Sequence, residues 1–294
     1  MNDEDGFLKL SEARVSIVGL GLMGASLAMD LRGHCAEIIG VGRGLETLNY
    51  ALEHQIVDRV ADFDDALDCD LLVLATPIRT ILQQLHQMGQ VLSAAQTSKS
   101  TIVVDMGSTK TEIVQAMQNL PPRFDPIGGH PMCGKEVAGI QYAETGLYHR
   151  QTFVLSPLQR TSPRALALVH EMIAIIGARP LVLTAEKQDE LVAVISHLPY
   201  LVASALVRTA LAKNDPQLWE VAASGFRDTS RLAASDLTMM LNILLTNRES
   251  VLDALKNYRT ELDALTALVE AGNEEMLKAA LVPGQQKRSQ LFKS

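Results

Sequence analysis

The sequence predicts an α/β fold, in which a domain with a Rossmann-type parallel sheet is followed by an all-helical domain. In the first half, short apolar runs alternate with stretches of helical spacing, which is typical of βαβ units and a parallel sheet. After Thr184 the strand-like runs stop and long helical periodicities begin. The 294 residues are enough for two domains with separate cores. We therefore expect domains at 1–185 and 186–294.

The expected strands are short buried runs that end at glycine, proline or polar residues. In the first half they are Arg14–Leu20, Glu37–Val41, Asp70–Ala75 and Thr101–Asp105, and we expect Thr152–Leu155 and Pro180–Leu183 to extend the same sheet. The expected helices have apolar residues at helical spacing. They are Gly24–Leu31 in the first domain and Leu191–Leu206, Leu237–Leu245, Val251–Leu268 and Met276–Leu281 in the second.

Composition excludes several functional classes. The formal net charge is -8 and there is no block of basic residues, which argues against nucleic acid or an anionic membrane as the main partner. Cys35, Cys69 and Cys133 do not have metal-ligand spacing, so we expect no metal site. Three free thiols are most simply explained by a reducing cytoplasm. We therefore expect a cytoplasmic protein.

Neither of two segments predicts export or membrane insertion. Met1–Arg14 is acidic and lacks the apolar core of a signal peptide. Leu191–Val207 carries no full charge, but it is slightly short for a bilayer and contains Ser196, His197 and Pro199. We expect this segment to be a buried core helix or a subunit-interface helix.

Gly19-Leu20-Gly21-Leu22-Met23-Gly24 is a GxGxxG motif between a predicted strand and a predicted helix. Glycines at these positions allow a tight turn, close approach of a pyrophosphate to the backbone, and close packing of the helix on the strand. The helix N-terminus offers free N–H groups and a positive dipole end to phosphates. The motif therefore predicts a dinucleotide site at Gly19, Gly21, Leu22, Met23 and Gly24.

The end of the second strand bears on which dinucleotide binds. NAD-dependent enzymes place an acidic residue there to bind the ribose hydroxyls. This chain has Gly42 at that position, followed by Arg43. The missing carboxylate removes repulsion of a 2′-phosphate, and a guanidinium can pair with that phosphate. We favour NADP, with NAD as the alternative; Arg43 could otherwise be a solvated loop residue.

Two further strand ends should lie at the same carboxyl edge, where cofactors bind in open α/β sheets. Thr76 and Pro77 follow one strand, and Asp105–Lys110 ends the next. Ser108 could therefore reach the nicotinamide or a catalytic partner. Alternatively, Ser108 caps a helix beginning at Thr109, and the two roles are compatible.

Three other clusters, with the glycine motif and Asp105–Lys110, resemble the prephenate/arogenate dehydrogenases of tyrosine biosynthesis. The clusters are Gly128–Gly134 (GGHPMCG), Ser196–Pro199 (SHLP) and Ser224–Arg231 (SGFRDTSR). The resemblance runs from about Val15 to Arg231, with a compatible helical tail. It implies oxidative decarboxylation of prephenate or arogenate with hydride transfer to a nicotinamide.

The resemblance also implies roles for individual residues. His130 matches the catalytic histidine that accepts a hydrogen bond from the substrate hydroxyl, and Ser108 matches the serine that orients it. Arg231 matches the arginine that binds a substrate carboxylate. Arg227 offers a second positive charge beside Asp228, or the two form an ordinary surface ion pair. His197 contacts substrate or is a buried structural histidine.

At two positions the chain departs from many relatives. Tyr200 stands where some carry a second histidine, and Lys135 stands where many have a small polar residue. No residue distinguishes prephenate from arogenate. The helical domain is too apolar to stand alone, so we expect a homodimer built through it.

Two alternative functions stay open at this point. One is a β-hydroxyacid-type dehydrogenase, although Lys187, Lys213 and Lys256 lack the glycine-rich surroundings of the lysine on which those enzymes rely. The other is a catalytically silent NADP-sensing regulator, against which the joint presence of Ser108, His130 and Arg231 argues.

Overall fold

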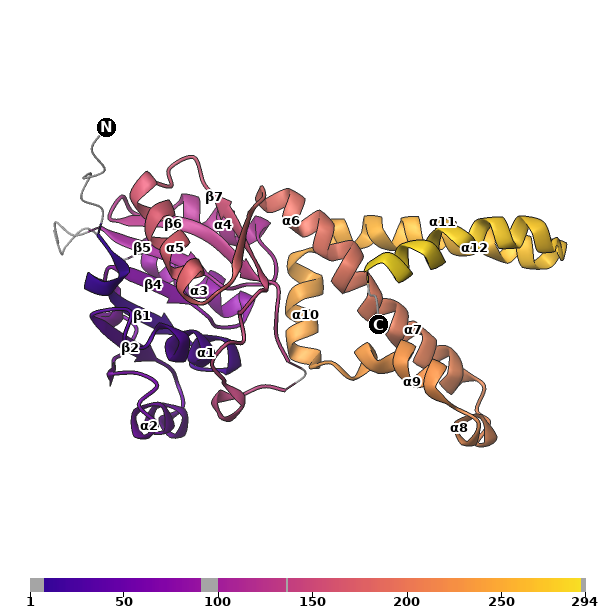
Figure 1. The fold of residues 1–294 in the computed structure, drawn as a ribbon, viewed down its shortest axis with the longest axis horizontal. Helices are drawn as coiled ribbons and strands as arrows, with labels where there is room; N and C mark the ends of the chain where they lie inside the picture. The colour runs from indigo at the N-terminus through magenta and orange to yellow at the C-terminus, as the bar shows by residue number, and fades with distance from the viewer. Residues whose placement is uncertain (1–7, 91–99, 136, 292–294) are drawn as a thin grey trace. The chain divides into compact units, whose positions relative to one another are not determined.

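The computed structural model describes residues 8–90, 100–135 and 137–291 (Figure 1). The prediction that Met1–Arg14 is no signal peptide lies partly outside these residues. The chain divides into two compact units, Met1–Asn247 and Arg248–Ser294. The first unit contains the whole sheet and the first helices after it. The domain boundary predicted at 185/186 stays a prediction.

An eight-stranded sheet is the framework of the first unit, within the part of the chain that the structure describes. Its spatial order is β3-β2-β1-β4-β5-β6-β7-β8. The strands are β1 (Arg14–Val18), β2 (Glu37–Val41), β3 (Arg59–Val60), β4 (Leu71–Leu74), β5 (Thr101–Asp105), β6 (Phe124–Pro131), β7 (Thr152–Pro157) and β8 (Arg179–Val182). The predicted Rossmann-type sheet is confirmed, and all six predicted strands are present.

The sheet differs from the prediction in two respects. It includes β3 and β6, for which no strand was predicted, and β7 pairs antiparallel with β6, His130 lying opposite Val154. All other strand pairs are parallel. Hydrophobic periodicity identifies a buried strand but does not give its direction, which depends on how the connecting segment crosses the sheet.

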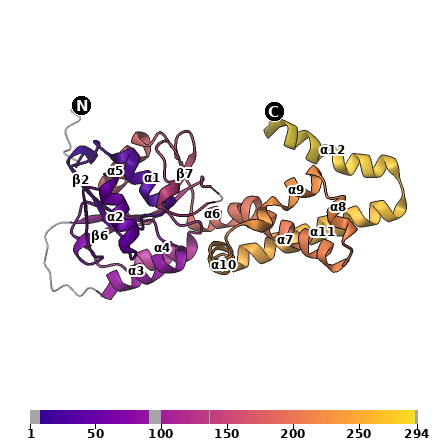
Figure 2. The same cartoon turned by 90° about the horizontal axis from the view of Figure 1, so that it is seen from below.

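Helices cover both faces of the sheet (Figures 1 and 2). Residues of α1 (Leu22–Leu31), α2 (Leu45–Glu53) and α5 (Pro163–Ile175) join one apolar core. Residues of α3 (Ile78–Gln90) and α4 (Thr111–Gln118) join the other. The central strands β4 and β5 are buried throughout, as expected for a sheet covered on both sides.

From Ala185 onward the described residues form only helices and turns, which confirms the predicted all-helical part. The first unit continues through α6 (Ala185–Val192), α7 (Leu198–Ala212), α8 (Gln217–Glu220), α9 (Ser224–Ser230) and α10 (Leu237–Thr246). The second unit consists of α11 (Arg248–Ala271) and α12 (Glu274–Leu291), joined at Gly272, which has φ +61°.

The uncharged segment predicted at 191–207 forms part of a continuous helical run, Ala185–Ala212. This run has the length and mean hydropathy, 1.7, of a membrane span, and 22% of its most apolar window is buried. The stretch Ala193–His197 within it is π-helical. Pro199 lies two residues after this stretch, and its ring and missing N–H disturb the regular bonding of the preceding turn. The apolar residues Val194 and Ile195 are exposed at 53% and 64%.

Candidate functional site

The GxGxxG motif forms a tight turn between β1 and α1. Gly19 has φ +102°, and a Cβ on it would lie 2.7 Å from the carbonyl oxygen of Ala75. A Cβ on Gly24 would lie 1.9 Å from the carbonyl oxygen of Gly19, so only glycine allows this packing of helix on strand. Gly21 is the N-cap of α1 and has open space where its Cβ would be. The turn therefore leaves the α1 N-terminus accessible to an anion.

Beside this turn lies a cavity of about 540 Å³. Gly19 and Gly21 border it at one side, and Gly42, Arg43 and Thr47 border it beyond the end of β2. Arg43 is the one cation, and Asp62 the one carboxylate, among the described residues that line it. The Asp62 carboxylate accepts a hydrogen bond from the Asp65 N–H at 2.8 Å. The residues predicted from the glycine motif and from the end of β2 thus share one cavity.

A second cavity of about 370 Å³ adjoins the first, since Gly21, Thr76 and Gly139 line both. It brings together Leu22 and Met23 of α1, Pro77 at the start of α3, and residues after β5 and on β6. These include Ser108 and His130, and α10 contributes Thr238 and Asn242. Four predicted groups from separate parts of the sequence therefore lie around one space at the carboxyl edge of the sheet.

His130 is held near this cavity by β6, directly beside β5. Gln188 of α6 donates from Nε2 to the Nδ1 of His130 at 3.1 Å and to the Ser108 carbonyl oxygen at 3.2 Å. Burial lowers the pKa of His130 to about 3, and the Lys110 ammonium and His197 act in the same direction. His130 is therefore a neutral imidazole over the physiological pH range.

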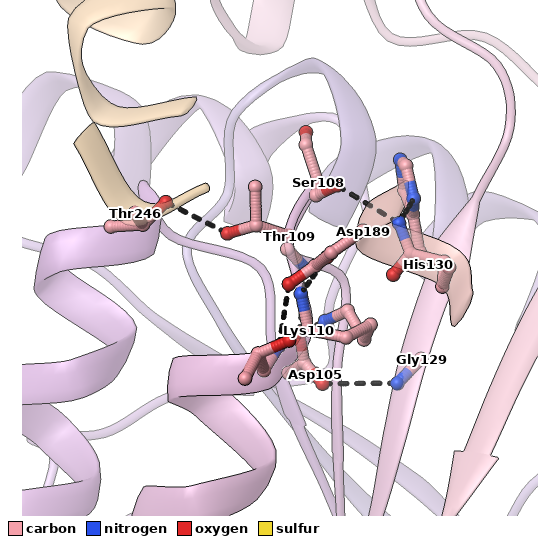
Figure 3. A network of polar contacts seen from close by, with 11 residues as sticks. Asp105, Ser108, Thr109, Lys110, Gly129, His130, Asp189 and Thr246 are labelled. Atoms are coloured by element: carbon pink, nitrogen blue, oxygen red, sulfur yellow. Dashed lines mark hydrogen bonds and ion pairs between the residues drawn. The ribbon is translucent and has the colours of Figure 1, made fainter. Parts of the chain in front are cut away.

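A buried polar network supports the loop that carries Ser108 (Figure 3). Lys110 and Asp105 form an ion pair in which neither side chain is exposed. The Asp105 carboxylate also accepts hydrogen bonds from the Gly107 N–H at 2.7 Å and the Gly129 N–H at 3.0 Å. Asp105 thereby ties the end of β5 to β6, one residue before His130.

Asp189 connects the same loop to α6. Its carboxylate accepts from the N–H groups of Lys110 at 2.7 Å and Thr111 at 2.8 Å, at the N-terminus of α4. This is the favourable end of the helix for a negative charge. The alternative prediction that Ser108 caps this helix is wrong, because the N-cap is Lys110 and Asp189 supplies the bonds. A distant carboxylate satisfies the free amides better than the nearby hydroxyl.

The comparisons with known proteins agree with this arrangement. Residues 27–182 match the model for the prephenate dehydrogenase nucleotide-binding domain, and residues 184–282 match that for the prephenate dehydrogenase dimerization domain. A prephenate dehydrogenase of Bacillus subtilis is 31% identical over 270 residues, which cover 90% of this chain and 72% of that protein.

The chain belongs to the prephenate dehydrogenase family.

Two solved structures of relatives resemble the whole fold. Synechocystis arogenate dehydrogenase is 34% identical with a TM-score of 0.81, over 95% of this chain and 100% of that one. Aquifex aeolicus prephenate dehydrogenase, in complex with hydroxyphenyl propionate and NAD+, is 31% identical with a TM-score of 0.88, over 96% and 99%. The family match favours the predicted prephenate/arogenate class over a β-hydroxyacid-type dehydrogenase.

The three residues predicted to bind substrate lie outside the linings of both cavities. His197 is buried and contacts Asn247, whose Nδ2 lies 3.3 Å from its Nδ1. Burial lowers the pKa of His197 to about 4. Arg227 forms an exposed ion pair with Asp228, as one of the two predictions for it allowed, and Arg231 is exposed on the same helical segment. That His197, Arg227 and Arg231 contact the substrate stays a prediction.

Sequence reasoning missed Gln188, Asp189 and the Lys110–Asp105 pair. Gln188 and Asp189 are 1% and 2% exposed, although they lie in a polar stretch that resembles an ordinary solvated helix start. Lys135, which was noted as a departure from many relatives, lines the second cavity and pairs with Glu144 at 2.6 Å. Tyr200, the other departure, packs against the core under α3 and α4.

Proposed function

We propose that this chain catalyses the oxidative decarboxylation of prephenate to 4-hydroxyphenylpyruvate, or of arogenate to tyrosine, with hydride transfer to NADP. One observation carries the proposal: His130 and Ser108 line the same cavity as the residues at the start of α1. A ring bound there would have its hydroxyl beside a neutral imidazole and its reacting carbon beside the cofactor cavity. When bound, the nicotinamide accepts the hydride.

His130 suits the proposed role because a neutral imidazole protonated on Nδ1 can accept a hydrogen bond from the substrate hydroxyl at Nε2. Accepting that bond supports the positive charge that develops on the ring carbon as hydride leaves. Loss of the ring carboxylate as CO2 then makes the ring aromatic. The phenol product carries a hydroxyl, so the proton drawn toward His130 returns to the same oxygen and the reaction releases no net proton.

The residues of the first cavity fit a dinucleotide. Its pyrophosphate would meet the α1 N-terminus at Gly21, where no side chain intervenes, and its adenosine end would lie toward Gly42 and Arg43. Support for NADP over NAD comes from the absence of a carboxylate at Gly42 and the presence of Arg43 in the lining. The A. aeolicus relative was crystallised with NAD+, so both cofactors enter the test.

The test is an initial-rate assay of the full chain with prephenate and with arogenate, each with NADP and with NAD. We expect turnover in at least one combination, fastest with NADP. Folded protein that binds NADP but turns over neither substrate would contradict the proposal and support the silent sensor instead. Turnover faster with NAD would contradict only the cofactor preference.

Replacing Arg43 with alanine should weaken NADP binding more than NAD binding, because only NADP has a phosphate for the guanidinium. A charge-assisted contact of this kind contributes about 1.5–3 kcal/mol, or roughly a 10- to 100-fold change in Kd. Calorimetric titration of both cofactors measures it. The matched control is Arg32→Ala, which removes a half-exposed arginine outside the cavity. Equal losses of affinity for both cofactors would show that Arg43 does not bind the 2′-phosphate of NADP.

We also propose that the protein is a cytoplasmic homodimer. Support comes from the match to the family's dimerization domain and from the exposed apolar residues Leu191, Val194 and Ile195 on the Ala185–Ala212 run. Contiguous exposed apolar surface of this kind commonly marks an interface. Light scattering at micromolar concentration should give twice the mass of one chain. A monomeric mass would contradict the proposal.

A further inference from the structure

The side-chain amide of Gln188 is the one group of α6 that reaches His130. Gln188 is buried, and its Nε2 lies 3.1 Å from His130 Nδ1 and 3.2 Å from the carbonyl oxygen of Ser108. Its Oε1 is also buried and has no hydrogen-bond partner among the described residues. A buried amide oxygen without a partner costs free energy, so this arrangement calls for an explanation.

The Ser108 carbonyl determines how the amide faces. A carbonyl oxygen can only accept, so it must meet Nε2 and not Oε1. The second hydrogen of Nε2 then points to Nδ1 of His130, which must be the unprotonated nitrogen. A neutral imidazole has one N–H, and therefore Nε2 of the His130 ring carries the proton in this arrangement. No described residue is hydrogen-bonded to Nε2 of His130, so this ring nitrogen is the one left for a ligand.

That tautomer is the wrong one for the proposed reaction. With its proton on Nε2, the ring can donate to a substrate oxygen but cannot accept from the substrate hydroxyl. Acceptance requires the proton on Nδ1, and Nδ1–H requires an acceptor. Rotating the Gln188 amide by half a turn would bring Oε1 to Nδ1, at the expense of the bond to Ser108. The partnerless Oε1 is thus the atom that the reactive tautomer needs.

We propose that Gln188 is a positioning residue whose amide, by turning one end or the other toward Nδ1, selects the nitrogen of His130 that carries the proton. The free protein holds the resting tautomer, protonated on Nε2. The reactive tautomer, protonated on Nδ1, is reached when the amide turns. This inference rests on the proposed function for its use in catalysis, although the contact itself does not.

Asp189 fixes the part of α6 from which the Gln188 amide reaches His130. It follows Gln188 directly, and its two bonds to the N-terminus of α4 anchor α6 against the loop that carries Ser108. Asn247 adds a third bond, from its Nδ2 to the Asp189 carbonyl oxygen at 2.7 Å. The Gln188 amide therefore extends from a helix turn that is fixed at both its side chain and its backbone.

The charged groups around His130 come from several elements. Lys110, at the start of α4, and His197, in the π-helical stretch, both disfavour the imidazolium. Asp105 on β5 faces Lys110 and Gly129, and Asp189 on α6 faces Lys110 and Thr111. Cys133, Lys135 and Asp236 line the cavity. None of the hydrogen bonds and ion pairs found in the described residues joins a carboxylate to His130, so a carboxylate introduced at 188 would be a new kind of partner.

Two variants test whether the Gln188 amide selects the tautomer of His130: one can only accept a hydrogen bond from Nδ1, and the other can make no hydrogen bond. In Gln188→Glu the carboxylate can only accept, so it should hold the proton on Nδ1 and raise the pKa of His130. In Gln188→Leu the side chain is one atom shorter and makes no hydrogen bond, so neither tautomer is selected. Glu190→Gln is the matched control, because Glu190 lies on the same helix, is exposed and pairs only with Lys187 among the described residues.

The primary experiment is nitrogen NMR of the full chain labelled with 15N-histidine, without substrate. The His130 signals are identified by their loss in His130→Asn. We expect the proton on Nε2 in the unaltered chain and in Glu190→Gln, on Nδ1 in Gln188→Glu, and on a mixture of both nitrogens in Gln188→Leu. The same tautomer in all four proteins would overturn the proposal, and so would Nδ1 protonation in the unaltered chain.

The pH dependence of kcat/KM provides the second readout. The unaltered chain should show no loss of activity from His130 protonation above about pH 4, because its pKa is about 3. Gln188→Glu should lose activity on acidification at a pH at least 1 unit higher, and should recover toward the unaltered rate at alkaline pH. Gln188→Leu should lose roughly 10- to 100-fold at every pH, which is typical when a partner that orients a functional histidine is removed.

A merely structural Gln188 would give a different result. Both variants would then lose thermal stability, and neither the NMR tautomer nor the shape of the pH profile would change, which would overturn the proposal. Failure of the proposed function is distinguishable, because the NMR experiment needs no turnover. Tautomers that shift as expected in a chain that converts neither substrate would retain the role of Gln188 and reject the reaction.

Discussion

His130→Asn is expected to lower kcat by about 10²- to 10⁴-fold, which is the usual contribution of a positioned acid–base group. Asparagine has a similar size and can donate a hydrogen bond through its amide, but it cannot take up a proton at neutral pH. The Kd of NADP should change little, because His130 lines the second cavity and not the first. Steady-state rates and a cofactor titration measure the two effects separately.

The control is His34→Asn, which alters an exposed histidine outside both cavities. Its kcat should match that of the unaltered chain. If His130→Asn turned over prephenate or arogenate at the unaltered rate, His130 would have no part in proton transfer. A large loss of cofactor binding instead would mean that the substitution disturbs β6.

Lys110→Met is expected to destabilise the folded protein by about 3–5 kcal/mol, because it leaves the Asp105 carboxylate buried without its counter-charge. Both side chains are fully buried, so water cannot replace the lost ammonium. The Gly107 and Gly129 amides still bond the carboxylate but carry no net charge. The free energy of unfolding in urea is the measurement.

Two further variants make this result interpretable. Lys187→Met removes an exposed ion pair with Glu190 on α6 and should change stability by less than about 1 kcal/mol. The double variant Asp105→Asn/Lys110→Met removes both charges and should be more stable than Lys110→Met alone. A Lys110→Met protein within about 1 kcal/mol of the unaltered chain would refute the importance of the pair.

The strands that could be predicted from the sequence are those whose apolar residues suit burial on both faces of a sheet. The runs that became β1, β4 and β5 consist mostly of Val, Ile and Leu, and the sheet buries them on both faces. β6 was missed because Phe124–Pro131 contains two prolines and two glycines, which are disfavoured in strands. The glycines are needed there: a Cβ on Gly129 would lie 2.5 Å from the Asp105 carbonyl oxygen. Tertiary packing overrides local propensity in this strand.

The site was predicted where its residues follow strand ends, and missed where it depends on distant partners. The carboxyl ends of parallel strands share one edge, so Gly21, Thr76, Ser108 and their neighbours could be placed together from topology alone. Gln188 and Asp189 contact His130 and Thr111 across 58 and 78 positions of the chain. Neither residue has a local pattern that distinguishes it from a solvated helical residue.

The attachment of Asp189 to the start of α4 also has a mechanical consequence. A hinge near the predicted boundary at 185/186 would have to break the two bonds from the α4 amides and the bond from Asn247. It would also leave the first N–H groups of α4 without the Asp189 carboxylate that accepts from them. We therefore expect the junction between the sheet and α6 to be rigid, so that only the side-chain amide of Gln188, and not the backbone around His130, has to move when substrate binds.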